Sequence, residues 1–273
     1  MDTLLRNARR KLSQGLLFWR EAGEGMPLIL LHGAWHDSGQ WVSVMESLSL
    51  HFHCFAPDLL GFGESENPNI HYSIDLQVEC VAEFLQALRL EQVYLVGDSL
   101  GAWIAASYAL KYGEQVRGLV LLSPEGVKIA GQEQKCQKMR QLIKRSPLLF
   151  KVLRSLRFFT KILRLEEKIA QDWQKRQTLQ QYPTSAQLLF QRQQSEIEAE
   201  LLENRLSSLA VPVLILQGGK DTPDALARTQ IYSKLISQAE LNMIAHVSNN
   251  LPESCAGVVA GDIRKFIQES QKL

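Results

Sequence analysis

Ser99 lies in the stretch GDSLG, between Gly97 and Gly101, where the apolar run 93–98 gives way to a helical pattern. A serine hydroxyl becomes a good nucleophile when a base takes its proton, and that base is usually a histidine oriented by a carboxylate. The two glycines permit a sharp strand-to-helix turn. Such a turn would present the serine at the carboxyl edge of a parallel sheet. The alternative interpretation is a Gly-rich turn without chemistry.

His246 is the predicted base. It ends the last strand-like run, 241–246, and precedes the last helical pattern, 252–269, so we expect it at the same edge of the sheet as Ser99. Two carboxylates could orient it, because Asp221 and Glu125 each follow a strand-like run. Both acids keep the chain order serine, acid, histidine. The glycine pair before Asp221 favours that residue, and Glu125 remains the alternative acid.

The elements that would position these residues alternate along the chain. Continuous apolar runs suit strands buried on both faces, and strands that alternate with helices predict a mostly parallel sheet covered by helices on both faces. We therefore predict an α/β fold. The strand-like runs are 27–33, 53–58, 93–98, 118–124, 211–219 and 241–246, and the helical patterns are about 40–50, 74–90, 99–113, 224–237 and 252–269.

The interval 126–205 has no strand-like run and is too long for a loop, which predicts an inserted helical lid. It carries 16 Lys and Arg against 8 Asp and Glu, a surface unlike that of the remaining chain. The predicted core comprises 15–125 and 206–273. Residues 1–14 are interpreted as a basic, partly helical arm.

The composition indicates an ordinary globular protein. The chain has 273 residues, of which 45% are hydrophobic and 22% charged, and a formal net charge of +1, so we expect no nucleic-acid partner. The four cysteines form no CxxC pair, so we expect neither a metal site nor disulfides, and reduced thiols favour a cytoplasmic location. No organic cofactor is expected, and the pattern does not indicate an oligomeric state.

Taken together, the motifs resemble the α/β-hydrolase superfamily, in particular its lidded serine hydrolases. LLHGAW is similar to the family's oxyanion motif, and DLLGFGES to its D-x-x-G-x-G-x-S loop. GDSLGA resembles the nucleophile elbow, GGKD the acid turn and HVSNNLPE the histidine turn. The resemblance covers about 15–125 and 208–270. It implies that the backbone N–H groups of Ala34 and Leu100 form the oxyanion hole.

The residue before the nucleophile departs from the family pattern. It is Asp98 here, where the family usually has histidine and its carbon–carbon bond hydrolases have asparagine. Serine at the nucleophile position disfavours haloalkane dehalogenase and epoxide hydrolase chemistry. We therefore predict a serine hydrolase that acts on an ester-type bond. The alternatives are a carbon–carbon bond hydrolase and a lipid- or ligand-binding module that kept the triad without turnover.

The predicted lid contains a basic amphipathic stretch, 148–165. One interpretation is a lid helix that packs its apolar side over the active site. The other is a surface that docks on an anionic membrane and makes the protein peripherally membrane-associated. In both cases the lid offers apolar side chains, which favours a small hydrophobic acyl substrate. The predicted substrate contacts are Trp35, Phe150 and Phe159.

Replacing the five cations of this stretch with Gln should abolish a weak, salt-sensitive binding to vesicles rich in anionic lipid, because each cation near such a surface contributes about 1 kcal/mol. Hydrolysis of small soluble esters should be unchanged. Vesicle flotation measures the binding, and equal flotation with neutral vesicles would contradict membrane docking. The cations are Lys151, Arg154, Arg157, Lys161 and Arg164.

Overall fold

The computed structural model describes residues 5–146, 148 and 166–271. The chain divides into two compact units. The first comprises Met1–Ile129 and Glu198–Leu273, and the second is Ala130–Ile197. The second unit lies within the interval predicted as an insertion.

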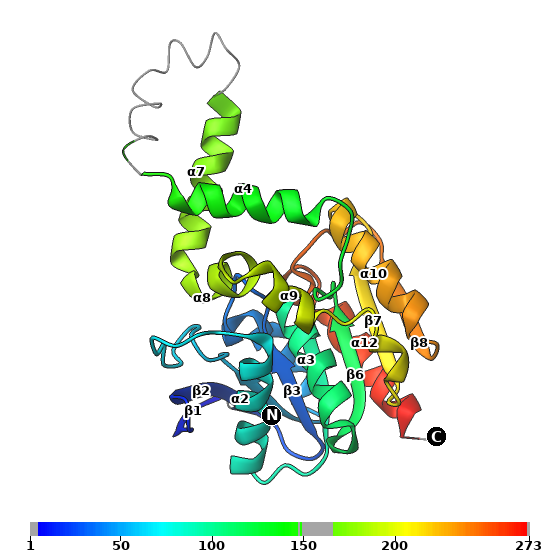
Figure 1. The fold of residues 1–273 in the computed structure, drawn as a ribbon. Helices are drawn as coiled ribbons and strands as arrows, with labels where there is room; N and C mark the ends of the chain where they lie inside the picture. The colour runs from blue at the N-terminus through cyan, green and yellow to red at the C-terminus, as the bar shows by residue number, and fades with distance from the viewer. Residues whose placement is uncertain (1–4, 147, 149–165, 272–273) are drawn as a thin grey trace. The chain divides into compact units, whose positions relative to one another are not determined.

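The first unit is built on an eight-stranded sheet (Figure 1). The strand order is β1-β2-β4-β3-β5-β6-β7-β8, with β1, β2 and β4 paired antiparallel and all later neighbours paired parallel. The strands are β1 (Arg6–Lys11), β2 (Leu16–Ala22), β3 (Pro27–Leu31), β4 (His53–Pro57), β5 (Val93–Asp98), β6 (Val116–Leu122), β7 (Val213–Gly218) and β8 (Ala239–Ile244).

Helices cover both faces of this sheet, as the continuous apolar strands require. On one face, α1 and α12 pack against each other and share a buried core with the strands, in which Trp41 and Ile263 are fully buried. On the other face, α2 packs against α3. The helices of this unit are α1 (Val42–Leu48), α2 (Ile74–Ala87), α3 (Leu100–Lys111), α10 (Pro223–Leu235), α11 (Leu251–Ser254) and α12 (Ala256–Ser270), with the 3-10 helix η1 at Ser38–Trp41.

The second unit is helical. Its helices are α4 (Gln132–Lys144), α7 (Glu166–Gln181) and α8 (Pro183–Ala186), and α9 (Gln194–Glu200) runs from this unit into the first. The guanidinium of Arg140 donates to the Arg192 carbonyl at 2.8 Å, and that of Arg176 donates to the Arg145 carbonyl at 3.1 Å. The predicted amphipathic stretch 148–165 lies, apart from Leu148, outside the described residues.

The expected α/β fold is confirmed, and all six strand-like runs became strands. The prediction of a partly helical arm at 1–14 was wrong, because Arg6–Lys11 forms β1 and pairs with β2. Lys11 pairs with Glu66 at 2.8 Å, and Arg9 pairs with Glu64. β1 is almost wholly exposed and polar, so the sequence of the arm shows no apolar alternation that would indicate a strand. None of the described helices is long and apolar enough to cross a membrane.

Ile263→Ala should lower the free energy of unfolding by about 2–5 kcal/mol, because it leaves a cavity where α12 meets the sheet. Val258→Ala, on the same helix with its side chain half exposed, should cost much less. Urea unfolding of both variants measures the difference. Equal losses would show that α12 does not anchor the core.

Candidate active site

The turn between β5 and α3 holds Ser99 in a strained backbone conformation, with φ 52° and ψ −107°. Close packing enforces this turn. A Cβ on Gly97 would lie 2.3 Å from the Gly101 carbonyl oxygen, and a Cβ on Gly101 would lie 2.2 Å from that of Leu31. Larger residues would therefore push α3 away from β3 and β5. A non-glycine residue at such an angle costs about 1–3 kcal/mol, a strain typical of functional positions.

The loop after β3 is braced by buried side chains. The ring of His32 accepts the N–H of Leu59 at Nε2 (3.0 Å), so Nδ1 carries the proton and donates to the Gly33 carbonyl at 2.9 Å. Burial lowers the pKa of His32, which keeps the ring neutral. The N–H of Gly33 is itself bound by the Gln40 side chain at 2.9 Å. The next residue along the loop is Ala34, whose N–H the family resemblance predicts to be an oxyanion donor.

Asp98, the residue before Ser99, is buried and faces this loop. Its Oδ2 accepts a hydrogen bond from Gln40 Nε2 at 2.9 Å. Burial raises the pKa of Asp98 to about 7, the Gln40 hydrogen bond opposes that rise, and nearby carboxylates add to it. Below that pH the carboxyl is neutral. A neutral group beside Ser99, the predicted nucleophile, would not repel negative charge that develops on a substrate oxygen.

Asp221 lies in the turn after β7, and both of its carboxylate oxygens are hydrogen-bonded. Oδ2 accepts from Ser123 Oγ at 3.2 Å and from Gln217 Nε2 at 3.0 Å, while Oδ1 accepts from the Thr222 N–H at 2.6 Å. Donors from two neighbouring strand ends therefore hold this carboxylate in place.

Glu125, the alternative acid, has a different partner. Its Oε1 accepts from Arg228 of α10 at 2.8 Å, and its backbone N–H donates to the Ser99 carbonyl at 3.2 Å. Burial raises the pKa of Glu125, and the Arg228 charge opposes that rise. An acid already paired with an arginine is a poor choice to orient a histidine, so the contacts favour Asp221.

His246 follows β8 with φ 67°, and its side chain is exposed. Its loop lies beside the acid turn, because the Lys220 N–H donates to the Val247 carbonyl at 2.9 Å. Within the described part of the chain, however, the His246 ring is hydrogen-bonded neither to Asp221 nor to Ser99. The structure thus places the loop of His246 beside the turn of Asp221. Among the described residues, no hydrogen bond joins the His246 ring to the side chains of Ser99 and Asp221.

Several contacts of this site had no signal in the sequence. Gln40, Ser123 and Gln217 belong to no motif, and their importance follows only from the atoms they bind. Of the predicted substrate contacts, Trp35 is half-buried in the loop after β3, whereas Phe150 and Phe159 lie outside the described residues.

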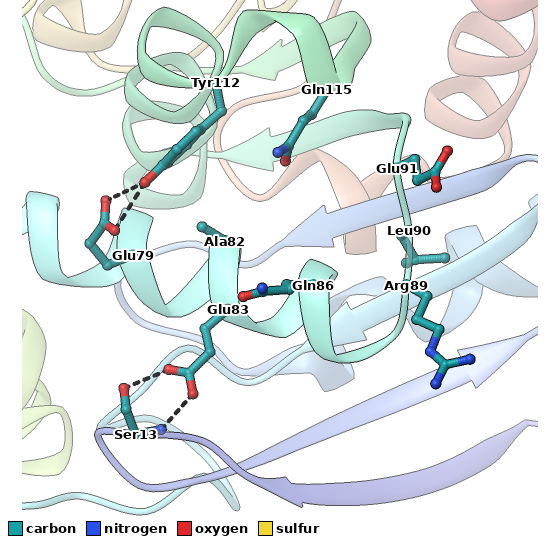
Figure 2. A pocket seen from close by; sticks show the side chains of 10 residues that line it. All are labelled: Ser13, Glu79, Ala82, Glu83, Gln86, Arg89, Leu90, Glu91, Tyr112 and Gln115. Atoms are coloured by element: carbon teal, nitrogen blue, oxygen red, sulfur yellow. Dashed lines mark hydrogen bonds between the residues drawn. The ribbon is translucent and has the colours of Figure 1, made fainter.

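A cavity of about 730 Å³ lies elsewhere on the first unit, along α2 (Figure 2). Two of its acids are already hydrogen-bonded, Glu79 to Tyr112 and Glu83 to Ser13. None of the predicted catalytic residues lines it. No group of three potential metal ligands occurs among residues 5–146, 148 and 166–271.

Comparison with known proteins gives one extensive match and several partial ones. The family model described as alpha/beta hydrolase fold matches residues 26–251. A 114-residue segment is 39% identical to 2-hydroxy-6-oxo-2,4-heptadienoate hydrolase of Pseudomonas putida, covering 39% of this chain and 40% of that protein. A 115-residue segment is 39% identical to 1-acylglycerol-3-phosphate O-acyltransferase ABHD5 of Rattus norvegicus, covering 41% and 33%. These matches span two fifths or less of the relatives' length.

Two solved structures share the fold at low sequence identity. One is described as a membrane phospholipase A, with a TM-score of 0.77, 21% identity, and coverage of 98% of this chain and 87% of that one. The other is the meta-cleavage product hydrolase CumD of Pseudomonas fluorescens, with a TM-score of 0.74, 22% identity, and coverage of 96% and 98%.

Asp221→Asn should lower kcat for ester hydrolysis by about 10³- to 10⁴-fold, because it would remove the charge that we predict to orient and stabilise a protonated His246. Glu125→Gln should lower kcat by less than about tenfold, since that carboxylate contacts Arg228. Steady-state kinetics with a p-nitrophenyl ester compares the two variants. The reverse ranking would make Glu125 the acid.

Proposed function

Because this chain belongs to the α/β-hydrolase family, we propose that it is a serine hydrolase that cleaves an ester-type bond in a hydrophobic substrate. The observation that carries the proposal is the strained backbone conformation of Ser99, just before α3. The glycines on either side, Gly97 and Gly101, have no room for a side chain. A simple connecting turn would not need a strained residue. A nucleophilic serine needs it, because its hydroxyl must project away from the backbone.

The proposed reaction uses residues that follow β3, β5, β7 and β8. Asp221, after β7, orients His246. Ser99 Oγ attacks the carbonyl carbon, and its proton passes to His246. The N–H groups of Ala34 and Leu100 donate to the oxyanion; that of Leu100 lies at a helix N-terminus and has no acceptor within α3. The proton then passes from His246 to the departing alcohol, which leaves an acyl-enzyme. Water, deprotonated by the same histidine, hydrolyses this ester and restores Ser99.

His246 must change its contacts for this reaction. Catalytic hydrogen bonds are often long or absent before substrate binds, so an exposed ring is compatible with a base that engages later. Its loop already touches the acid turn through Lys220. A side-chain rotation or a small shift of residues after β8 is the movement that the proposal requires.

The proposed substrate carries an apolar acyl group. Trp35 lies next to Ala34 in the loop after β3, which we call the oxyanion loop, and would supply an aromatic surface. Phe150 and Phe159 of the predicted lid would add to it. We further propose a cytoplasmic enzyme that touches anionic membranes through 148–165. This arrangement would deliver a lipid-like substrate.

Carbon–carbon bond hydrolysis is a second candidate, favoured by the similarity to the Pseudomonas putida hydrolase. Asp98 occupies the position at which the carbon–carbon bond hydrolases have asparagine, and this difference disfavours carbon–carbon bond hydrolysis. A binding module without turnover is a third candidate, favoured by the missing hydrogen bond between His246 and Asp221. Activity on an ester, on a 2-hydroxy-6-oxo-2,4-dienoate or on neither separates the three.

Ser99→Ala should abolish labelling by a fluorophosphonate probe and hydrolysis of p-nitrophenyl butyrate, because both need the Ser99 oxygen. Ser107→Ala is the matched control. It changes a buried serine of α3, the helix that Ser99 precedes, whose hydroxyl has no hydrogen-bond partner among the described residues, and it should keep both activities. Gel fluorescence and absorbance measure the outcome.

Full activity in folded Ser99→Ala protein would refute the assignment of the nucleophile. A wild-type protein that neither reacts with the probe nor hydrolyses either substrate class would leave the binding module as the function.

A further inference from the structure

The side-chain amide of Gln40 joins three loops of the site. Gln40 lies in η1 and is 3% exposed. Its Oε1 accepts from the Gly33 N–H at 2.9 Å, and its Nε2 donates to Asp98 Oδ2 at 2.9 Å and to Asn250 Oδ1 at 3.1 Å. One buried amide thus binds the loop after β3, the elbow after β5 and the segment after β8.

These three loops come from distant parts of the chain. Gln40 is 58 positions from Asp98 and 210 from Asn250. Asn250 sits in the left-handed region at φ 58° before α11, and its Nδ2 donates to Glu253 at 2.6 Å, which orients its own oxygen. The carboxamide of Gln40 has one acceptor and two donor hydrogens, and each group is used.

The approach of the oxyanion loop to the elbow is close. A Cβ on Gly33 would lie 2.6 Å from Asp98 Oδ2. Gly33 directly precedes Ala34, and Asp98 directly precedes Ser99. The hydrogen bonds of Gln40 therefore act one residue away from the nucleophile and one residue away from a predicted oxyanion donor.

We propose that Gln40 is a positioning residue, which sets the distance between the oxyanion loop and the nucleophile elbow. The inference rests on the proposed function, since its effect on catalysis requires that Ser99 reacts. An oxyanion donor works only when it is held within about 0.5 Å of its productive place. The amide of Gln40 supplies that constraint without touching the substrate. A buried side chain that only filled space would not need a hydrogen-bond partner in each of these three segments.

The test compares Gln40→Met with Gln77→Met. Both changes replace a buried amide with a chain of similar length. Gln77 lies in α2 and donates to the Leu60 carbonyl at 2.8 Å, outside the site. Gln40→Met should lower kcat for p-nitrophenyl butyrate by about 10- to 100-fold with KM little changed, because oxyanion contacts strengthen in the transition state. Gln77→Met should keep kcat.

Hydrogen–deuterium exchange provides a readout that does not depend on activity. In Gln40→Met, the peptide that contains Gly33 should exchange faster, because its N–H has lost its acceptor. The same peptide in Gln77→Met should exchange as in the wild type. If the wild-type protein hydrolyses no substrate, the proposed function fails, and exchange alone decides whether Gln40 positions the loop.

Unchanged exchange at Gly33 in folded Gln40→Met would overturn the proposal. So would equal losses of kcat in the two variants, because a general loss of packing would then explain both. If Gln40→Met does not fold, Gln40→Asn replaces it. The shorter amide keeps its polarity but cannot reach all three partners, so it should show the same two effects in smaller measure, and wild-type behaviour would overturn the proposal.

Discussion

The packing of Gly101 against the end of β3 is the constraint on which the site depends. With the carbonyl oxygen of Leu31 only 2.2 Å from where a Cβ would lie, α3 can start directly beside the central strands. The chain turns at Ser99, which adopts φ 52°, whereas neither Gly97 nor Gly101 has a positive φ. The position of Ser99 therefore follows from backbone packing, and its strain is supported by the buried sheet around it.

The parallel arrangement of the central strands explains why polar groups gather at one edge. In a parallel sheet, strand ends that are far apart in sequence meet on one side. Asp221 receives hydrogen bonds from the ends of two strands through Ser123 and Gln217, and Gln40 connects three more segments. A polar network that joins so many separate segments stabilises their relative positions and not only its own members.

The sequence predicted the elements with continuous buried runs and the motifs with fixed spacing. It located β3 to β8 and the glycines around Ser99, because both are local patterns. It did not predict β1 and β2, which pair with each other, and β1 is almost wholly exposed and has no apolar alternation. The role of Gln40 was not predicted either, since a single glutamine forms no periodic pattern. Its role follows from its hydrogen bonds to Asp98 and Asn250. The placement of His246 also depends on a loop conformation that spacing does not determine.

The hairpin of β1 and β2 has a consequence for the protein in solution. β1 is the first strand of the sheet, so its outer backbone groups face no further strand of this unit. An open edge invites a strand from another molecule to add to the sheet and begin a filament. β1 bears Arg6, Arg9, Arg10 and Lys11, of which Arg9 and Lys11 are paired with glutamates. Two such edges that met would repel each other, and more weakly as salt concentration rises.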